Sequence, residues 1–246
     1  MSLALKHHAE FRNVLTKYQM SERAKKALEG LKFILTVAPT STGRNTIIRH
    51  LVKHKNYYFI VSDTTRQPQI RDGRMEQNGI DYFFRTEEEM LRDLKAGEFL
   101  EAAIIHEQQV SGVSIRELER AKLLNRTAIT DIETLGTDIV MRTTPEAKAI
   151  FLVPPGFEEW QTRINSRGHM SKEEFRNRLG SADHEFKSAL EHEYYNLVIA
   201  DNVEHASSII DDIANGKPNT QQDQARDLIH SLQDQLASKL ESMKYM

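Results

Sequence analysis

The sequence predicts an α/β fold in which a mostly parallel sheet lies between helices. Short runs of β-branched and aromatic residues alternate with helical patterns along the chain, and strands joined through helices pair in parallel. A loop of small residues also joins the first apolar strand to a helix, which is a common place for phosphate binding in α/β proteins. The length of 246 residues is sufficient for one large domain with extensions.

The composition excludes several classes of protein. The chain has no cysteine, so it forms neither disulfides nor thiolate metal sites. Its net charge of -3 argues against a protein that coats nucleic acid. We see no apolar run long enough to cross a bilayer and no signal-peptide core, so we expect no membrane association and a cytoplasmic location. The 10 histidines show no metal-ligand spacing.

Residues 1–30 are predicted to form an N-terminal helical extension. Apolar residues recur at a roughly helical spacing from Leu5 through Phe11 to Tyr18. Ser21 is a suitable N-cap for a second helix that ends before Gly30.

A strand at Leu31–Val37 precedes a candidate phosphate-binding loop and an apolar helix at Ile47–Val52. Backbone N–H groups of such a loop, together with the helix N-terminus, form an anion-binding nest. The usual pattern is G-x-x-x-x-G-K-[ST], of which this chain keeps only Gly43. Ala38 and Ser41 are tolerated at negative φ but strained at positive φ. The residues predicted to bind the donor phosphates are Ser41, Thr42, Gly43, Arg44, Asn45 and Thr46.

Three later segments predict a site for a purine monophosphate. They run from Asp63 to Pro68, from Gly79 to Phe84 and from Gly97 to Glu101. An arginine offers a planar fork to phosphate oxygens, and a tyrosine hydroxyl can donate to the same phosphate. A carboxylate accepts the two parallel N–H groups that guanine presents and adenine does not. The residues concerned are Arg66, Tyr82 and Glu101.

The remaining elements follow from caps and β-branched runs. Capping boxes are predicted at Thr86, opening a helix to Ala96, and at Ser114, opening a helix to about Leu124. Ser171 is predicted to cap a further helix. The other expected strands are Tyr57–Ser62, Thr127–Ile132, Ala149–Val153 and Leu197–Ala200.

From about residue 31 to residue 215 the chain resembles the guanylate kinase family. The resemblance implies a P-loop NTPase three-layer core, a small GMP-binding subdomain at about 62–113 and a helical lid at about 160–185. It also implies transfer of the γ-phosphoryl group of ATP to GMP, giving ADP and GDP, with Mg²⁺. We expect GMP and ATP to be the partners, with no nucleic acid and no membrane.

The resemblance assigns roles to residues at matching positions. For GMP these are Ser62 and Glu101 at the base, Arg66 and Tyr82 at the phosphate, and Glu133, a conservative replacement of a family aspartate. Asn45 and Asp131 are matched to Mg²⁺, mostly through water. The expected catalytic set comprises Arg44, Asp131 and the lid arginines Arg163, Arg167 and Arg178.

Several departures from the family pattern keep alternatives open. Gln69 stands where a second phosphate arginine is usual, so Arg71 or Arg74 is a possible replacement. The second phosphate tyrosine falls on Val110 or Ser111. With the altered phosphate loop, these changes leave two alternatives: a weak or inactive binding module that uses the acceptor cleft for a nucleotide or phosphopeptide, and a kinase for another small phosphate ester.

Residues 216–246 are predicted to form a linker and an amphipathic C-terminal helix. Its apolar stripe either packs on the domain or on the N-terminal helix, or forms a helical dimer contact, so the expected state is a monomer or a homodimer through terminal helices. The stripe consists of Leu228, Ile229, Leu232, Leu236, Leu240 and Met243.

Overall fold

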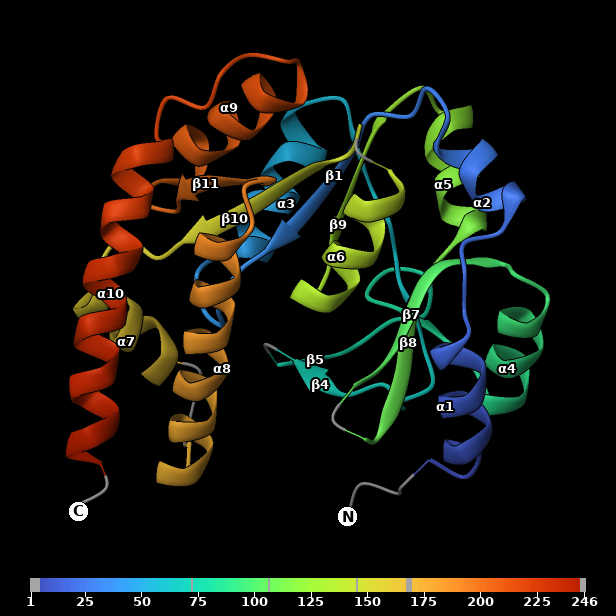
Figure 1. Ribbon diagram of the computed structural model, residues 1–246, viewed down its shortest axis with the longest axis horizontal. Helices are drawn as coiled ribbons and strands as arrows, with labels where there is room; N and C mark the ends of the chain where they lie inside the picture. The colour runs from blue at the N-terminus through green and yellow to red at the C-terminus, as the bar shows by residue number, and fades with distance from the viewer. Residues whose placement is uncertain (1–4, 72, 106, 145, 167–169, 244–246) are drawn as a thin grey trace. The chain divides into compact units, whose positions relative to one another are not determined.

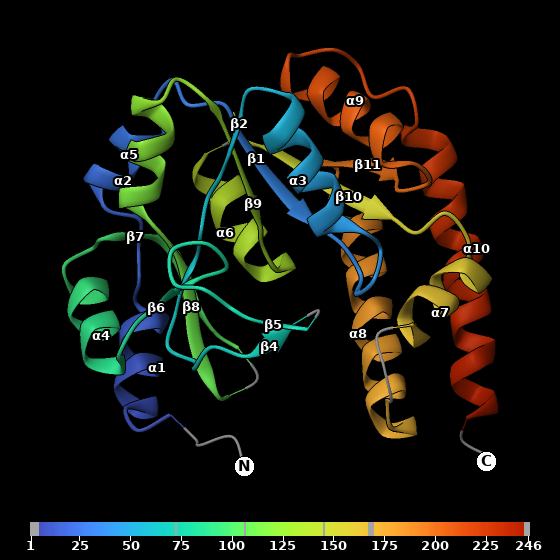
Figure 2. The ribbon, with the colours of Figure 1, turned by 180° about the vertical axis from the view of Figure 1, so that it is seen from behind.

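The computed structural model describes residues 5–71, 73–105, 107–144, 146–166 and 170–243 (Figures 1 and 2). The chain divides into two compact units, which are described separately. Unit 1 consists of Met1–Phe33, Tyr58–Thr130 and Asp138–Glu146. Unit 2 consists of Ile34–Tyr57, Asp131–Thr137 and Ala147–Met246.

The larger sheet has five strands in the order β11-β10-β1-β9-β2. Both β1 with β10 and β10 with β11 pair in parallel, and every residue of β1 is buried. Such near-continuous apolar strands are typical of parallel sheets covered on both faces. The predicted α/β fold with a mostly parallel sheet is therefore confirmed. The strands are β1 (Phe33–Val37), β2 (Tyr57–Phe59), β9 (Thr127–Asp131), β10 (Lys148–Val153) and β11 (Tyr195–Ile199).

Helices of unit 2 pack on this sheet and on one another. α3 packs against α9, and α10 runs beside α8 and contacts β11 (Figures 1 and 2). Trp160, Phe186 and Phe151 meet at ring-centroid distances of 5.8 and 6.1 Å and fill the core beneath these helices. The helices are α3 (Arg44–His54), α7 (Phe157–Asn165), α8 (Lys172–Glu191), α9 (Val203–Ala214) and α10 (Gln222–Ser242), while α6 (Thr134–Thr143) crosses the boundary between the units.

Unit 1 contains a four-stranded sheet in the order β6-β3-β8-β7. A β-hairpin formed by β4 and β5 lies between Gln69 and Gly79. Gly112 lies where β7 and β8 approach closely, since a Cβ there would come within 2.5 Å of the Glu101 carbonyl oxygen. The strands are β3 (Asp63–Thr64), β4 (Ile70–Arg71), β5 (Arg74–Met75), β6 (Phe83–Phe84), β7 (Phe99–Ile105) and β8 (Gln109–Ser114).

The N-terminal extension forms two helices that pack within unit 1. α1 (His8–Thr16) contacts α4 (Glu87–Lys95) and β7, and α2 (Glu22–Leu28) contacts α5 (Ile115–Leu123). Phe11 is fully buried, and its apolar neighbours in the cluster include Met90, Leu91, Leu94, Phe99 and Val110.

Three of the four predicted caps are present. Ser21 accepts from the Ala24 N–H, Ser171 accepts from the Glu174 N–H, and Thr86 makes the full capping box. The capping box at Ser114 is wrong, although the helix begins there as expected, because the Ser114 side chain makes no cap bond. Its intended partner Glu117 is buried and instead accepts from the Tyr58 hydroxyl at 2.9 Å and the Val61 N–H at 3.3 Å.

Half of the apolar stripe of the C-terminal helix is buried within its own chain, while Leu228, Leu240 and Met243 are partly exposed. Ile229, Leu232 and Leu236 are fully buried, and α10 packs on α7, α8, β10 and β11. This is the packing that the sequence allowed as one of two alternatives. No helix in the described part of the chain is both long and apolar enough to cross a membrane.

We predict that Leu232→Ala will lower the free energy of unfolding by about 2–5 kcal/mol, because it removes a fully buried side chain. Leu240→Ala, at a partly exposed position of the same helix, serves as the control and should cost much less. Denaturant unfolding at two protein concentrations measures both. Equal losses in the two variants, or a midpoint that shifts with concentration, would indicate that the stripe is covered by a second molecule.

Candidate active site

The loop before α3 contains two residues with positive φ. Ser41 has φ 64° and Gly43 has φ 107°, so left-handed residues flank Thr42, whose hydroxyl donates to the Pro39 carbonyl oxygen at 2.7 Å. A left-handed conformation costs a non-glycine residue roughly 1–2 kcal/mol. The sequence left open whether Ser41 is strained, and the structure shows that it is.

The Ser41 hydroxyl is buried and has no hydrogen-bond partner among the described residues. A buried hydroxyl without a partner is unfavourable by roughly 1–3 kcal/mol. Strain and an unsatisfied polar group at the same residue are typical of a functional loop. A phosphate oxygen is an acceptor that would relieve this cost.

Arg44 and Asp131 form an ion pair beside this loop. The Arg44 Nη2 atom donates to Asp131 Oδ2 at 3.1 Å, and both side chains are about three-quarters buried. Arg44 is the first residue of α3 and Asp131 the last of β9, so strand and helix ends bring them together. Asn45 and Thr46 are exposed on the first turn of α3.

Two side chains of helix α7 donate hydrogen bonds to backbone carbonyl groups of the loop. The Trp160 ring N–H donates to the Thr40 carbonyl oxygen at 2.8 Å, and Arg163 Nη1 donates to that of Thr42 at 2.9 Å. Arg163 also pairs with Glu159 at 2.6 Å. The sequence analysis did not predict a role for Trp160. A lone tryptophan on a helix was the available signal, because a buried ring N–H requires a hydrogen-bond acceptor.

One other predicted lid arginine lies among the described residues. Arg178 pairs with Glu174, one turn earlier on α8, at 2.7 Å. Arg167 lies outside the described residues.

Besides Asp131, a carboxylate that the sequence analysis did not predict, that of Glu185, interacts with Arg44. Burial and the charge of Glu133 raise the pKa of Glu185 to about 8, while Arg44 opposes the rise. The Glu185 Oε2 atom is buried without a hydrogen-bond partner among the described residues. The available signal was helical spacing, since Glu185 falls three residues after the buried Ala182 of α8.

In unit 1, Arg66 is held by a bidentate ion pair with Glu76. Its Nη1 and Nη2 atoms lie 2.5 and 2.8 Å from the two carboxylate oxygens, and both side chains are largely buried. The guanidinium also lies 4.6 Å from the centre of the Tyr82 ring. The predicted phosphate ligands Arg66 and Tyr82 are therefore adjacent, and Glu76 is a partner that the sequence analysis missed.

Glu101 is buried on β7, where its Oε1 atom accepts from the Val113 N–H at 3.2 Å. Burial raises the pKa of Glu101 to about 7, and the Val113 hydrogen bond partly offsets the rise. Ser62 is half-buried, and its carbonyl oxygen accepts from the Phe83 N–H.

Several residues at the departures from the family pattern make contacts within unit 1. Val110 is buried, and Ser111 donates to the Thr64 hydroxyl at 2.8 Å. The Gln69 N–H donates to Glu76. Arg74 pairs with Asp81 in a bidentate contact.

Comparison with known proteins assigns the family. A family model described as guanylate kinase matches residues 30–216. The guanylate kinase of Corynebacterium diphtheriae is 34% identical over 188 residues, which are 76% of this chain and 95% of that protein. The chain belongs to the guanylate kinase family. It is therefore assigned as a nucleoside monophosphate kinase.

Two further relatives agree with this family. The guanylate kinase of Hahella chejuensis is 36% identical over 170 residues, or 69% of this chain and 78% of that protein. The crystal structure of guanylate kinase from Anaplasma phagocytophilum superposes with a TM-score of 0.55 at 25% identity, covering 78% of this chain and 88% of that one. Residues before 30 and after 216 lie outside the family match.

We predict that Glu185→Gln will stabilise the protein increasingly as pH rises from 5 to 8. A carboxyl group whose pKa is higher folded than unfolded favours the fold only while it is protonated, and this contribution is lost as pH rises toward 8. Glutamine does not ionise, so the variant avoids that loss.

Thermal unfolding without nucleotide or metal measures the difference from the parent protein. Glu173→Gln, at an exposed position of the same helix, is the matched control and should show no such trend. A Glu185→Gln difference that is constant across this pH range would contradict the burial of its charge.

Proposed function

We propose that this chain transfers the γ-phosphoryl group of ATP to GMP, releasing ADP and GDP, through the residues described above. The observation that carries the proposal is the loop before α3, with its positive φ values at Ser41 and Gly43 inside the family match. A binding module without phosphoryl transfer has no need of a strained donor loop. The family match favours the kinase over this alternative.

On the donor side, backbone N–H groups and the hydroxyls of the loop bind the ATP phosphates. The phosphate-binding residues are Ser41, Thr42, Gly43, Arg44, Asn45 and Thr46. Arg44 replaces the usual lysine, and its pair with Asp131 fixes the direction of the guanidinium while other N–H groups remain to donate to phosphate oxygens.

The oxygen donors near the loop suit Mg²⁺. The Asp131 carboxylate and the Asn45 amide oxygen are hard ligands, and Mg²⁺ in kinases usually retains several waters and binds through one or two protein oxygens plus substrate phosphates. When bound, the metal neutralises charge on the transferred phosphoryl group. Asp131 and Asn45 would hold it mostly through water.

On the acceptor side, Arg66 and Tyr82 bind the GMP phosphate, while Ser62 and Glu101 read the base and Glu133 contributes to nucleotide binding. Glu76 holds Arg66 in place, so the arginine is already ordered before GMP arrives. An ionised Glu101 accepts two N–H groups from guanine.

The reaction is an in-line displacement. A phosphate oxygen of GMP forms a bond to the γ-phosphorus as the bond to the ADP oxygen breaks, and no covalent enzyme intermediate is needed. Arg44, Arg163, Arg167 and Arg178 stabilise the negative charge that is spread over the transferred group, while Asp131 orients Arg44. Lid closure excludes water.

The proposed kinase domain consists of residues 31–215, with an acceptor subdomain at about 62–113 and a lid at about 160–185. The protein works in the cytoplasm as a monomer or a homodimer.

We predict that purified protein with ATP and Mg²⁺ will form ADP with GMP and far less with other nucleoside monophosphates. Arg44→Ala should lower kcat/KM for ATP by about 10²–10³-fold, the usual cost of removing one preorganised donor. Arg49→Ala, exposed on the same helix, is the control. A coupled assay measures ADP. Calorimetry that shows GMP binding, combined with no ADP formed from any monophosphate, would favour the binding module.

We predict that KM for GMP will fall as pH rises from about 6 to 8. Glu101 accepts guanine N–H groups best when ionised, and its pKa in the free protein is raised to about 7, so the competent fraction increases across this range. Glu101→Gln should lose this dependence and blunt the preference for GMP over AMP. The variant also serves as the control for ionisation of the GMP phosphate near pH 6. An unchanged base preference in the variant would refute the role of Glu101.

A further inference from the structure

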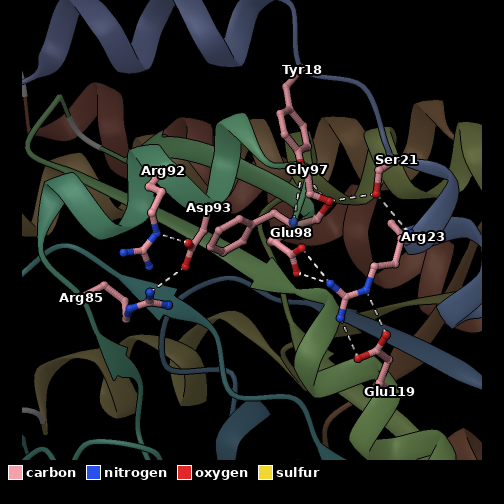
Figure 3. Close-up of polar contacts among 11 residues, drawn as sticks. Tyr18, Ser21, Arg23, Arg85, Arg92, Asp93, Gly97, Glu98 and Glu119 are labelled. Atoms are coloured by element: carbon pink, nitrogen blue, oxygen red, sulfur yellow. Dashed lines mark hydrogen bonds and ion pairs between the residues drawn. The ribbon is translucent and has the colours of Figure 1, made fainter.

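We propose that Tyr18, in the N-terminal extension, is a positioning residue for guanine recognition. It lies before the region that matches the family, which begins at residue 30. In the structure it holds the first residue of β7, two residues before Glu101 (Figure 3). The inference rests on the proposed function only in that Glu101 must read the base.

The Tyr18 hydroxyl makes both hydrogen bonds of one peptide position. It donates to the Phe99 carbonyl oxygen at 2.7 Å and accepts from the Phe99 N–H at 3.1 Å. β7 is the edge strand of its sheet, so these outward-facing groups have no neighbouring strand. The Tyr18 hydroxyl therefore makes the two hydrogen bonds that a neighbouring strand would otherwise make with Phe99.

Two more residues of the extension hold the same segment. Ser21 donates through its hydroxyl to the Gly97 carbonyl oxygen at 2.8 Å. Arg23 Nη1 lies 2.7 Å from both carboxylate oxygens of Glu98. Ser21 and Arg23 thus bind Gly97 and Glu98, as Figure 3 shows, and Tyr18 binds Phe99.

The bound segment leads directly into the irregular part of the strand pair. The register between β7 and β8 shifts between Phe99 and Glu101, which face Ser114 and Val113 respectively. A register shift of this kind changes the direction of the side chains that follow it. The Glu101 carboxylate consequently accepts from the Val113 N–H, and Tyr18 holds the residue at which the irregularity begins.

Arg23 extends the same support to α5. Its Nε and Nη2 atoms pair with Glu119 at 3.2 and 3.1 Å. On that helix Glu117 accepts from the Val61 N–H, the residue before Ser62. Glu101 and Ser62, the two residues proposed to read guanine, therefore each come shortly after a backbone segment that the extension supports. The support is direct for Glu101 and passes through α5 for Ser62.

These contacts are more specific than burial alone requires. The extension already buries Phe11 against α4 and β7, which accounts for its docking. The Tyr18 hydroxyl adds no apolar area, and its loss leaves the ring in place. A change in GMP binding on removal of this single oxygen therefore reports the position of β7 and not the docking of the extension.

The test compares Tyr18→Phe with Tyr57→Phe. Tyr57 is buried, whereas Tyr18 is partly buried; Tyr57 donates its hydroxyl to Asp211 at 3.2 Å and belongs to unit 2. Each variant loses one phenol oxygen, which makes two hydrogen bonds at Tyr18 and one at Tyr57, so general destabilisation should appear in both. We expect Tyr18→Phe to raise KM and Kd for GMP by about fivefold, roughly what one hydrogen bond contributes, with kcat and KM for ATP unchanged. Tyr57→Phe should leave GMP binding at the parental value.

Hydrogen exchange without nucleotide provides a readout that does not depend on catalysis. Tyr18→Phe should speed amide exchange from Leu100 to Ala103, and Tyr57→Phe should not. Parental exchange and parental GMP affinity in Tyr18→Phe would overturn the proposal, as would equal effects of the two variants on GMP. A parent protein that phosphorylates no GMP would defeat the proposed function, whereas faster exchange in Tyr18→Phe would still support positioning of β7.

Discussion

The ion pair between Arg66 and Glu76 is the interaction on which the acceptor side depends. Both side chains are largely buried and joined by two hydrogen bonds. Removal of either partner would leave a charge in a poorly solvated site, at a cost of about 3–5 kcal/mol. Glu76 also accepts from the Gln69 N–H, so the carboxylate ties Arg66 to the start of the β4–β5 hairpin. The β4–β5 hairpin thus keeps Arg66 ordered although the usual second arginine is absent.

On the donor side, the substitutions in the loop are accompanied by new contacts. Arginine at position 44 is longer than lysine and pairs with Asp131, which limits the orientations of its planar group. Serine at position 41 adopts a positive φ that glycine would adopt without strain. Trp160 and Arg163 bind the carbonyl groups of Thr40 and Thr42, and these bonds help to hold the strained backbone. A loop that matches the usual motif at one position can therefore still adopt positive φ at two positions, and the proposed phosphate binding depends on its backbone N–H groups.

Local patterns predicted the fold because its signals are local. The strand before the loop, three caps and the buried stripe of α10 follow from β-branched runs, hydroxyl residues and helical spacing. The failure at Ser114 shows the limit: the pattern was right, but a buried Glu117 binds the Tyr58 hydroxyl and the Val61 N–H instead of the helix terminus. Glu185 and Trp160 were not predicted for a similar reason, since their roles depend on partners distant in sequence. Arg178 was predicted from family spacing, which does not reveal that Glu174 is within reach one turn away.

The N-terminal extension shows how residues outside a family match can support a strand inside it. An edge strand that carries a buried carboxylate needs both a fixed backbone and a cover for its outward-facing polar groups. Tyr18 meets both needs with one hydroxyl, because the same oxygen donates to and accepts from Phe99. A residue that only covered the edge would need no such reciprocal geometry. The two bonds restrict movement of the strand along its own axis, the displacement that would shift Glu101 relative to Val113.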